Sequence, residues 1–159
     1  MLTRRRLVLD THVWLDWLVF DDPGITRIRN AVGLKRAEIF IDAVCEAELA
    51  RVLAYDLHRR KLDAAAQAAC IAQCRRLSHR IDATLPEPQR SGLPRCRDLD
   101  DQKFLEAALD SRAEFLLTKD RALLDLARRI AHFRILTPEG FEKADPSRSL
   151  PSSEAKGSG

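Results

Sequence analysis

Two aspartates follow apolar segments that have the character of buried strands. Asp10 comes directly after the run Leu7–Leu9, and Asp120 stands two residues after the run Phe115–Thr118. Short continuous apolar runs of this kind are typical of strands buried on both faces of a parallel sheet. Ligands bind such sheets beyond the carboxyl ends of the strands. We therefore expect both carboxylates to point into one crevice.

Further acidic residues lie in the chain between these two strands. Glu48 stands in a segment with helical spacing, and residues 98–101 form an acidic run that opens the helix before Phe115. Each acid alone has a structural explanation, because Asp favours N-cap positions and acidic residues suit the first turn of a helix. Together they would repel one another unless a cation neutralised them. Mg²⁺ and Mn²⁺ prefer carboxylate and water oxygens, so the sequence predicts such a site, suited to activating water for attack on phosphorus.

Other kinds of chemistry fit the sequence poorly. It contains neither GxxxxGK[ST] nor GxSxG, which excludes a phosphate-binding P-loop and makes a serine hydrolase implausible. His12 stands where a haloacid-dehalogenase-like phosphatase has its second aspartate. The four cysteines form no CxxC pair and show no zinc spacing, so we expect free, largely buried thiols.

The elements that must position the acids alternate along the chain. The expected strands are Leu7–Leu9, Glu38–Ile41, Arg80–Leu85, Phe115–Thr118 and Phe133–Leu136. The expected helices are Thr11–Phe20, Ile25–Gly33, Ala43–Tyr55, Leu62–Leu77, Asp98–Asp110 and Ala122–Ile130, and Pro138–Phe141 closes the domain. Strands separated by helices predict an α/β fold with a mostly parallel central sheet and helices on both faces.

Four motifs in this order resemble the PIN-domain ribonucleases. The segments LVLDTHVWL, AELARVL, RDLDDQKFLEAAL and AEFLLTKDRALLDL are similar to the four acidic motifs of that family, and RILTPEGF is similar to its VapC-like toxins. The resemblance runs from about Leu7 to Phe141. It implies a three-layer α/β/α fold and a Mg²⁺- or Mn²⁺-dependent endoribonuclease. It also implies a type II toxin, an antitoxin protein as its partner, and a homodimer.

The resemblance assigns roles to particular residues. The catalytic and metal-binding acids it implies are Asp10, Glu48, Asp101 and Asp120. Thr118 matches the threonine or serine before the last acid, where it would contact a ligand or Asp10. Nucleic acid also needs cations, so Lys119 and Arg121, beside the last acid, are candidates for binding the RNA substrate.

The third motif departs from the family. Many PIN proteins carry the third acid where Gln102 stands here, and His12 replaces a common asparagine. Either Asp101 reaches the metal, or Asp100 does, or the site is weakened. A weakened site would suit a second hypothesis, a catalytically weak module that binds RNA or protein. A third hypothesis is a housekeeping RNA-processing nuclease.

Composition limits the partners, the cellular location and the domain organisation that we expect. The chain has 159 residues and a formal net charge of +3, too mild to argue for nucleic acid by itself. No apolar run approaches the roughly 18 residues of a membrane span, and Asp10, His12 and Asp16 interrupt what would be a signal peptide. We therefore expect a cytoplasmic protein without a membrane partner. Residues 1–142 form the expected PIN-like domain, and residues 143–159 a mobile tail that is poor in apolar residues.

Overall fold

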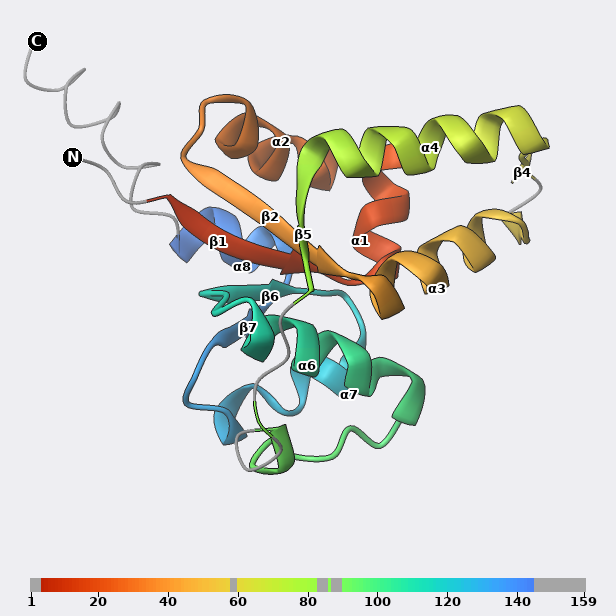
Figure 1. Ribbon diagram of the computed structural model, residues 1–159. Coiled ribbons are helices and arrows are strands. Elements are labelled where there is room, and N and C mark those ends of the chain that lie inside the picture. Colours follow the sequence, from red (N-terminus) through yellow and green to blue (C-terminus); the bar gives the residue numbers. More distant parts are fainter. Residues whose placement is uncertain (1–3, 58–59, 83–85, 87–89, 145–159) are drawn as a thin grey trace, which may run out of the picture.

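Five parallel strands form the central sheet, in the order β5–β2–β1–β6–β7 (Figure 1). This computed structural model describes residues 4–57, 60–82, 86 and 90–144. The strands are β1 (Arg5–Leu9), β2 (Ala37–Asp42), β5 (Ser78–Ile81), β6 (Phe115–Leu117) and β7 (Arg134–Leu136). Because every pair is parallel, the carboxyl ends of the strands share one edge of the sheet, as the sequence predicts.

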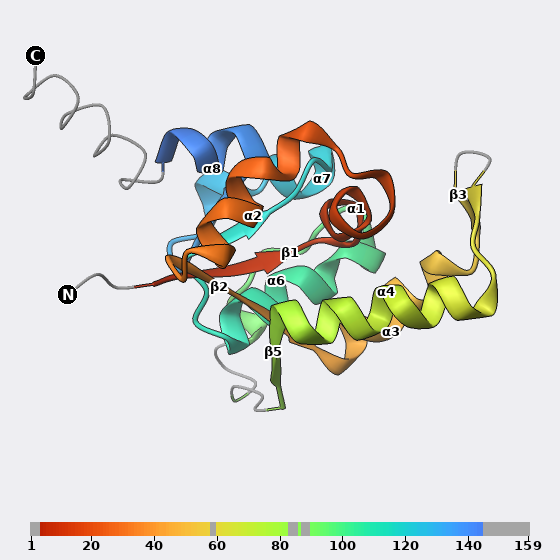
Figure 2. The same cartoon turned by 90° about the horizontal axis from the view of Figure 1, so that it is seen from above.

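Helices cover both faces of the sheet and form three α/β/α layers (Figure 2). The helical elements are α1 (Thr11–Leu15), η1 (Asp16–Phe20), η2 (Pro23–Ile25), α2 (Thr26–Gly33), α3 (Ala43–Leu53), α4 (Ala64–Leu77), η3 (Leu99–Asp101), α6 (Gln102–Asp110), α7 (Arg121–Leu124), η4 (Ala127–Arg129) and α8 (Pro138–Ala144). A small antiparallel pair, β3 (Asp56–Leu57) and β4 (Arg60–Lys61), lies between α3 and α4. The predicted α/β fold with a mostly parallel sheet is confirmed.

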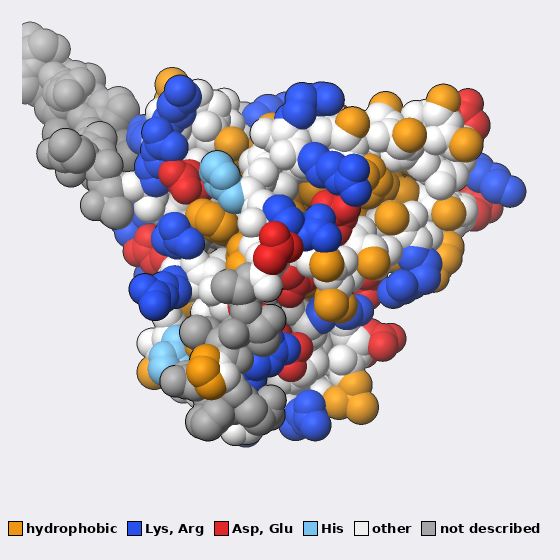
Figure 3. Space-filling view, in the orientation of Figure 1, with side chains coloured by type: hydrophobic (Ala, Val, Ile, Leu, Met, Phe, Trp, Pro, Cys, Tyr) orange, Lys and Arg blue, Asp and Glu red, His pale blue; other side chains and the backbone are white. Residues whose placement is uncertain are grey.

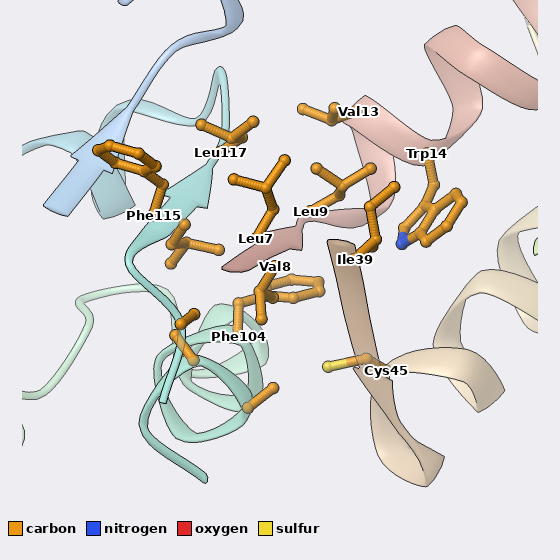
Figure 4. Close-up of a cluster of buried hydrophobic side chains, with 14 of the residues drawn as sticks. Leu7, Val8, Leu9, Val13, Trp14, Ile39, Cys45, Phe104, Phe115 and Leu117 are labelled. Carbon is orange, nitrogen blue, oxygen red and sulfur yellow. The ribbon is translucent and has the colours of Figure 1, made fainter. Parts of the chain in front are cut away.

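The two faces of the sheet bury different side chains. Leu7 pairs in register with Ile39 on β2 and with Phe115 on β6, so these three share a face. Phe115 meets the ring of Phe141 on α8 edge-on at 5.8 Å between centroids, which places α8 on that face. Val8 points the other way, towards Phe104 of α6 (Figure 4). This alternation fixes the register, because a slip of one residue would move every side chain of the strand to the opposite face, against a different set of helices.

Most predicted elements are present, with differences at their ends. The strand expected from Arg80 begins earlier, at Ser78, and residues 83–85 of that prediction lie outside the described residues. The helix expected from Thr11 to Phe20 splits into α1 and the π-helical η1, and the one expected from Ala122 splits into α7 and η4. The pair β3–β4 was not predicted, since two-residue strands leave no periodic signal.

The predicted tail, the cysteines and the two tryptophans can each be compared with the structure. Helix α8 runs to Ala144, two residues into the predicted tail, and residues 145–159 lie outside the described residues. All four cysteines are free thiols. Trp14 and Trp17 are buried in the core. No helix in the described part of the chain combines the length and apolar character needed to cross a bilayer.

The sheet core sets the stability of the fold. Leu116 on β6 is fully buried, with 0% of its surface exposed, whereas Leu34 is 66% exposed. We expect Leu116→Ala to lower the free energy of unfolding by about 2–5 kcal/mol, because it leaves a cavity in a packed layer. The matched change Leu34→Ala is expected to cost less than about 0.5 kcal/mol. Urea unfolding of both variants measures the difference, and equal effects would contradict the assigned core.

Candidate metal centre

A pocket of about 340 Å³ opens at the carboxyl edge of the sheet. Four separate segments bring carboxylates to its wall: the end of β1, helix α3, the η3 turn and the start of α7. The acids lining it are Asp10, Glu48, Asp98, Asp100, Asp101 and Asp120. All four acids predicted from the sequence therefore line one pocket, together with two more from the acidic run.

Asp10 is held rigidly at the floor of this region. It is buried and forms the N-cap of α1, where its Oδ1 accepts a hydrogen bond from the amide of Val13 at 2.9 Å. Its Oδ2 accepts a hydrogen bond from the hydroxyl of Thr118. Burial raises the pKa of Asp10, although both hydrogen bonds oppose that shift. The carboxylate is thus fixed in place and costly to leave charged without a nearby cation.

Thr118 connects the two strand ends. Its buried hydroxyl donates to Asp10 and accepts a hydrogen bond from the amide of Asp120 at 2.9 Å. Of the two contacts considered for Thr118 from the sequence, the structure contains the one with Asp10. The residue thereby sets the spacing between the acid after β1 and the acid after β6.

Three carboxylates form a tighter group inside the pocket. Asp98, Asp101 and Asp120 each place one oxygen within 4.8 Å of the others. Asp98 accepts a hydrogen bond from the amide of Asp100 at 3.1 Å, and Asp120 accepts one from the amide of Ala122 at 2.8 Å. These hydrogen bonds hold the carboxylates of Asp98 and Asp120 in a fixed orientation.

Asp101 is the central member of this group. Burial, and next to it the close contact with Asp120, raises the pKa of Asp101 to about 8. Its Oδ2 is buried and has no hydrogen-bond partner among the described residues. An unpartnered buried carboxylate oxygen among other carboxylates is the environment in which a hard divalent cation binds. The residues present therefore fit Mg²⁺ or Mn²⁺.

Glu48 lines the same pocket but is engaged by the chain's own cation. Its Oε1 forms a partly buried ion pair with Lys103 of α6, and its Oε2 accepts a hydrogen bond from the hydroxyl of Thr11 at 2.6 Å. Arg51 approaches Glu48 at 3.7 Å. Glu48 is therefore neutralised differently from the three aspartates. Lys103 is its main partner within the chain.

The structure explains the departure at Gln102. This side chain is buried and bonds to the preceding loop: its Oε1 accepts from the amide of Cys96 at 2.7 Å, and its Nε2 donates to the carbonyl of Pro94 at 3.1 Å. The side-chain amide of Gln102 thus binds this loop to the start of α6. Asp101 occupies the acid cluster instead, while Asp100 is exposed at the rim.

The predicted substrate contacts separate into two environments. Lys119 forms an ion pair with Asp16, and neither residue lines the acid pocket. Arg121 lines an adjoining hollow with Arg97, and this hollow shares Asp98 and Asp120 with the acid pocket. Arg97 and Arg121 therefore lie beside Asp98 and Asp120 in this hollow.

Asp98 is the site residue that sequence reasoning undervalued, because it was interpreted only as a helix cap. Residues Leu99–Asp101 form a 3₁₀ turn rather than the first turn of an α-helix. Asp98 caps this turn, and the amide of Asp101 donates to the carbonyl of Asp98 at 3.0 Å, an i→i+3 bond that brings the two aspartates together. The three-residue spacing between the two aspartates was the available signal.

The family model of the PIN domain matches residues 6–122, well over half of the chain. The chain belongs to the PIN domain family. Among curated proteins, none matches this sequence. The acidic pocket described above lies at the carboxyl edge of the sheet, where the positions of Asp10 and Asp120 after their strands predicted it.

Solved structures with a similar fold include two with low sequence identity. One is a chain in the crystal structure of VapBC2 from Rickettsia felis bound to a DNA fragment from their promoter, with a TM-score of 0.61 and 14% identity. That match covers 82% of this chain and 96% of the other. PAE2754 from Pyrobaculum aerophilum has a TM-score of 0.53 and 15% identity, with 85% of each chain covered. At such identities the likeness concerns the PIN fold alone.

The raised pKa of Asp101 makes the stability of the metal-free protein depend on pH. The folded pKa, about 8, lies above the ordinary value of 3.8, so the native state holds this proton more tightly. The resulting destabilisation is absent below about pH 4, grows as the pH rises and is complete above about pH 8. We expect Asp101→Asn to be more stable than the parent at pH 8.5 in chelator, with a gap that narrows towards pH 5. Thermal melts across this range measure it; a constant gap would contradict the assignment.

The Lys103–Glu48 pair is expected to stabilise the pocket. Lys103→Met leaves a mostly buried carboxylate without its cation, and we expect a loss of about 1–3 kcal/mol in the free energy of unfolding. Adding Glu48→Gln is expected to recover part of that loss, because the unpaired charge disappears. The exposed Lys61 on β4 provides the matched control, Lys61→Met. Denaturant unfolding of Lys103→Met, Glu48→Gln, the double variant and Lys61→Met tests this, and purely additive losses would argue against the pair.

Proposed function

We propose that this PIN domain protein is a Mg²⁺- or Mn²⁺-dependent endoribonuclease. PIN domains are in general nucleases, which gives the broad class. The observation that carries the proposal is the convergence of Asp98, Asp101 and Asp120 around a buried oxygen of Asp101 that lacks a partner. Carboxylates that repel one another at this spacing need a cation, and an all-oxygen donor set favours a hard one.

The acids of the pocket have different roles in holding the ion. Asp101 and Asp120 would hold the ion together with Asp98, and Asp10 would do so directly or through water. Glu48 completes the pocket from α3, with Lys103 balancing its charge. When bound, the ion supplies Lewis acidity to a water molecule and offsets charge on the phosphate.

The chain's own groups then serve the proton transfer and the positioning. A charged carboxylate that is not committed to the ion accepts the proton of the attacking water. Thr118 holds Asp10 at a fixed distance from Asp120, so the acids do not rearrange as charge develops. Arg121 has more support as a phosphate contact than Lys119, because Asp16 already engages Lys119.

We further propose RNA as the substrate and a toxin role with a separate antitoxin protein. The motifs similar to VapC-like toxins support this, as does the fold shared with a chain of VapBC2, a complex solved with promoter DNA. A homodimer in the cytoplasm is part of the same proposal. The sequence alternatives, a weak binding module and a housekeeping nuclease, provide the contrasting outcomes of the test.

The test is Mn²⁺-dependent cleavage of RNA by the purified protein. We expect Asp120→Asn to reduce cleavage by at least about 100-fold, because it removes a charge from the cluster. Asp82→Asn is the control: Asp82 is 87% exposed and does not line the pocket, so this change is expected to leave cleavage unchanged. Equal RNA binding by wild type and Asp120→Asn, with cleavage by neither, would instead support a binding module.

A further inference from the structure

Tyr55 lies on the wall of the acid pocket without a structural role of its own. It follows helix α3 and lines the pocket together with Arg51, Val52 and Phe104. Its side chain is 53% exposed and is not among the residues packed against the hydrophobic core. Within the described part of the chain, the ring has no hydrogen bond or ring contact; only its backbone amide is engaged, by the carbonyl of Val52 at 2.9 Å.

Aromatic rings are usually buried, because leaving their faces in water forgoes much of the free energy of burial. Phe104, in the same wall, is buried, and Val52 is half-buried. Besides the smaller imidazole of the exposed His12, Tyr55 therefore offers the accessible aromatic face of this pocket. Such a face beside a pocket for a phosphate is suited to stacking a nucleobase.

Arg51 supplies the charge that a nucleotide needs at this wall. It stands one helical turn before Tyr55 and is 58% exposed. Its distance of 3.7 Å from Glu48 makes that ion pair weak, since exposed pairs contribute little in water. The guanidinium is therefore available to a phosphate without breaking a strong interaction.

The acids lie between two cationic walls. The acid pocket carries Arg51 and Tyr55, and the adjoining hollow carries Arg97 and Arg121. The two hollows share Asp98, Asp100 and Asp120. A polynucleotide with its reacting phosphate at the shared acids therefore has one neighbouring nucleotide in each hollow.

We propose that Tyr55 and Arg51 form a nucleotide subsite, in which the base beside the reacting phosphate stacks on Tyr55 and an adjacent phosphate contacts Arg51. Paired bases in a duplex are covered by their neighbours, so this subsite selects unpaired nucleic acid. The proposal rests on the proposed nuclease function, because it takes the shared acids as the place of the reacting phosphate.

The binding test separates this subsite from catalysis. In an Asp120→Asn background with Mn²⁺, anisotropy of a labelled ten-nucleotide single-stranded oligoadenylate RNA reports affinity without cleavage. We expect Tyr55→Ala to weaken binding by about 5- to 100-fold, as the loss of one base stack does. Tyr55→Phe, which keeps the ring, is expected to restore affinity. Val44→Ala is the control, because Val44 is exposed on α3 away from the pocket.

A second measurement locates the base directly in the protein with Tyr55 intact. A single-stranded RNA with 5-iodouridine is expected to crosslink on irradiation to the peptide containing Tyr55. Unchanged affinity in Tyr55→Ala, or crosslinks confined to other peptides, would overturn the subsite. Absence of Mn²⁺-dependent cleavage by the wild-type protein would instead refute the nuclease function, so the two failures are distinguishable.

Discussion

Repulsion between carboxylates is the constraint around which this domain is organised. The parallel sheet delivers acids from distant segments to one edge, and no described lysine or arginine forms an ion pair with Asp98, Asp101 or Asp120. Of the nearby arginines, Arg51 approaches Glu48 and Arg97 pairs with Asp125. Backbone amides hold the acids in spite of the repulsion: those of Val13, Asp100 and Ala122 each donate to one of them. Because these amides belong to the first turns of short helical segments, the local dipoles also favour negative charge there. The caps thus keep the group assembled before any ion arrives.

Thr118 is uncharged, but it links two acids of the site through hydrogen bonds. Its hydroxyl can donate only one hydrogen bond, and Asp10 receives it, while an oxygen lone pair accepts the amide of Asp120. Strands β1 and β6 are adjacent, so this bridge joins two elements that the sheet already pairs. The relative position of the two acids is therefore fixed by main-chain pairing and by one fully buried side chain, which keeps the site rigid as part of the sheet core.

Much of the architecture follows from patterns that are local in the sequence. The apolar runs before Asp10 and Asp120 predicted the buried central strands, and the all-parallel arrangement then required the acids to meet. What the sequence could not show depends on contacts between distant residues. Gln102 has its partners in the loop of residues 94–96, Lys103 has its partner on α3, and Lys119 has its partner in η1. The role of Asp98 required knowing that a 3₁₀ turn, closed by the hydrogen bond from the amide of Asp101 to the carbonyl of Asp98, precedes α6.

The chain places its own cations beside some acids and withholds them from others. Lys103 balances Glu48, and Lys119 balances Asp16, so both carboxylates keep their charge without an added ion. None of the three clustered aspartates has such a partner, so their repulsion is relieved either by a proton on Asp101, whose pKa is raised to about 8, or by an added ion. A lysine placed among them would remove the repulsion and would also occupy the space between their oxygens. The selective absence of such a residue from the cluster, beside lysines that neutralise its neighbours, is what distinguishes a place for a cation from an ordinary network of surface ion pairs.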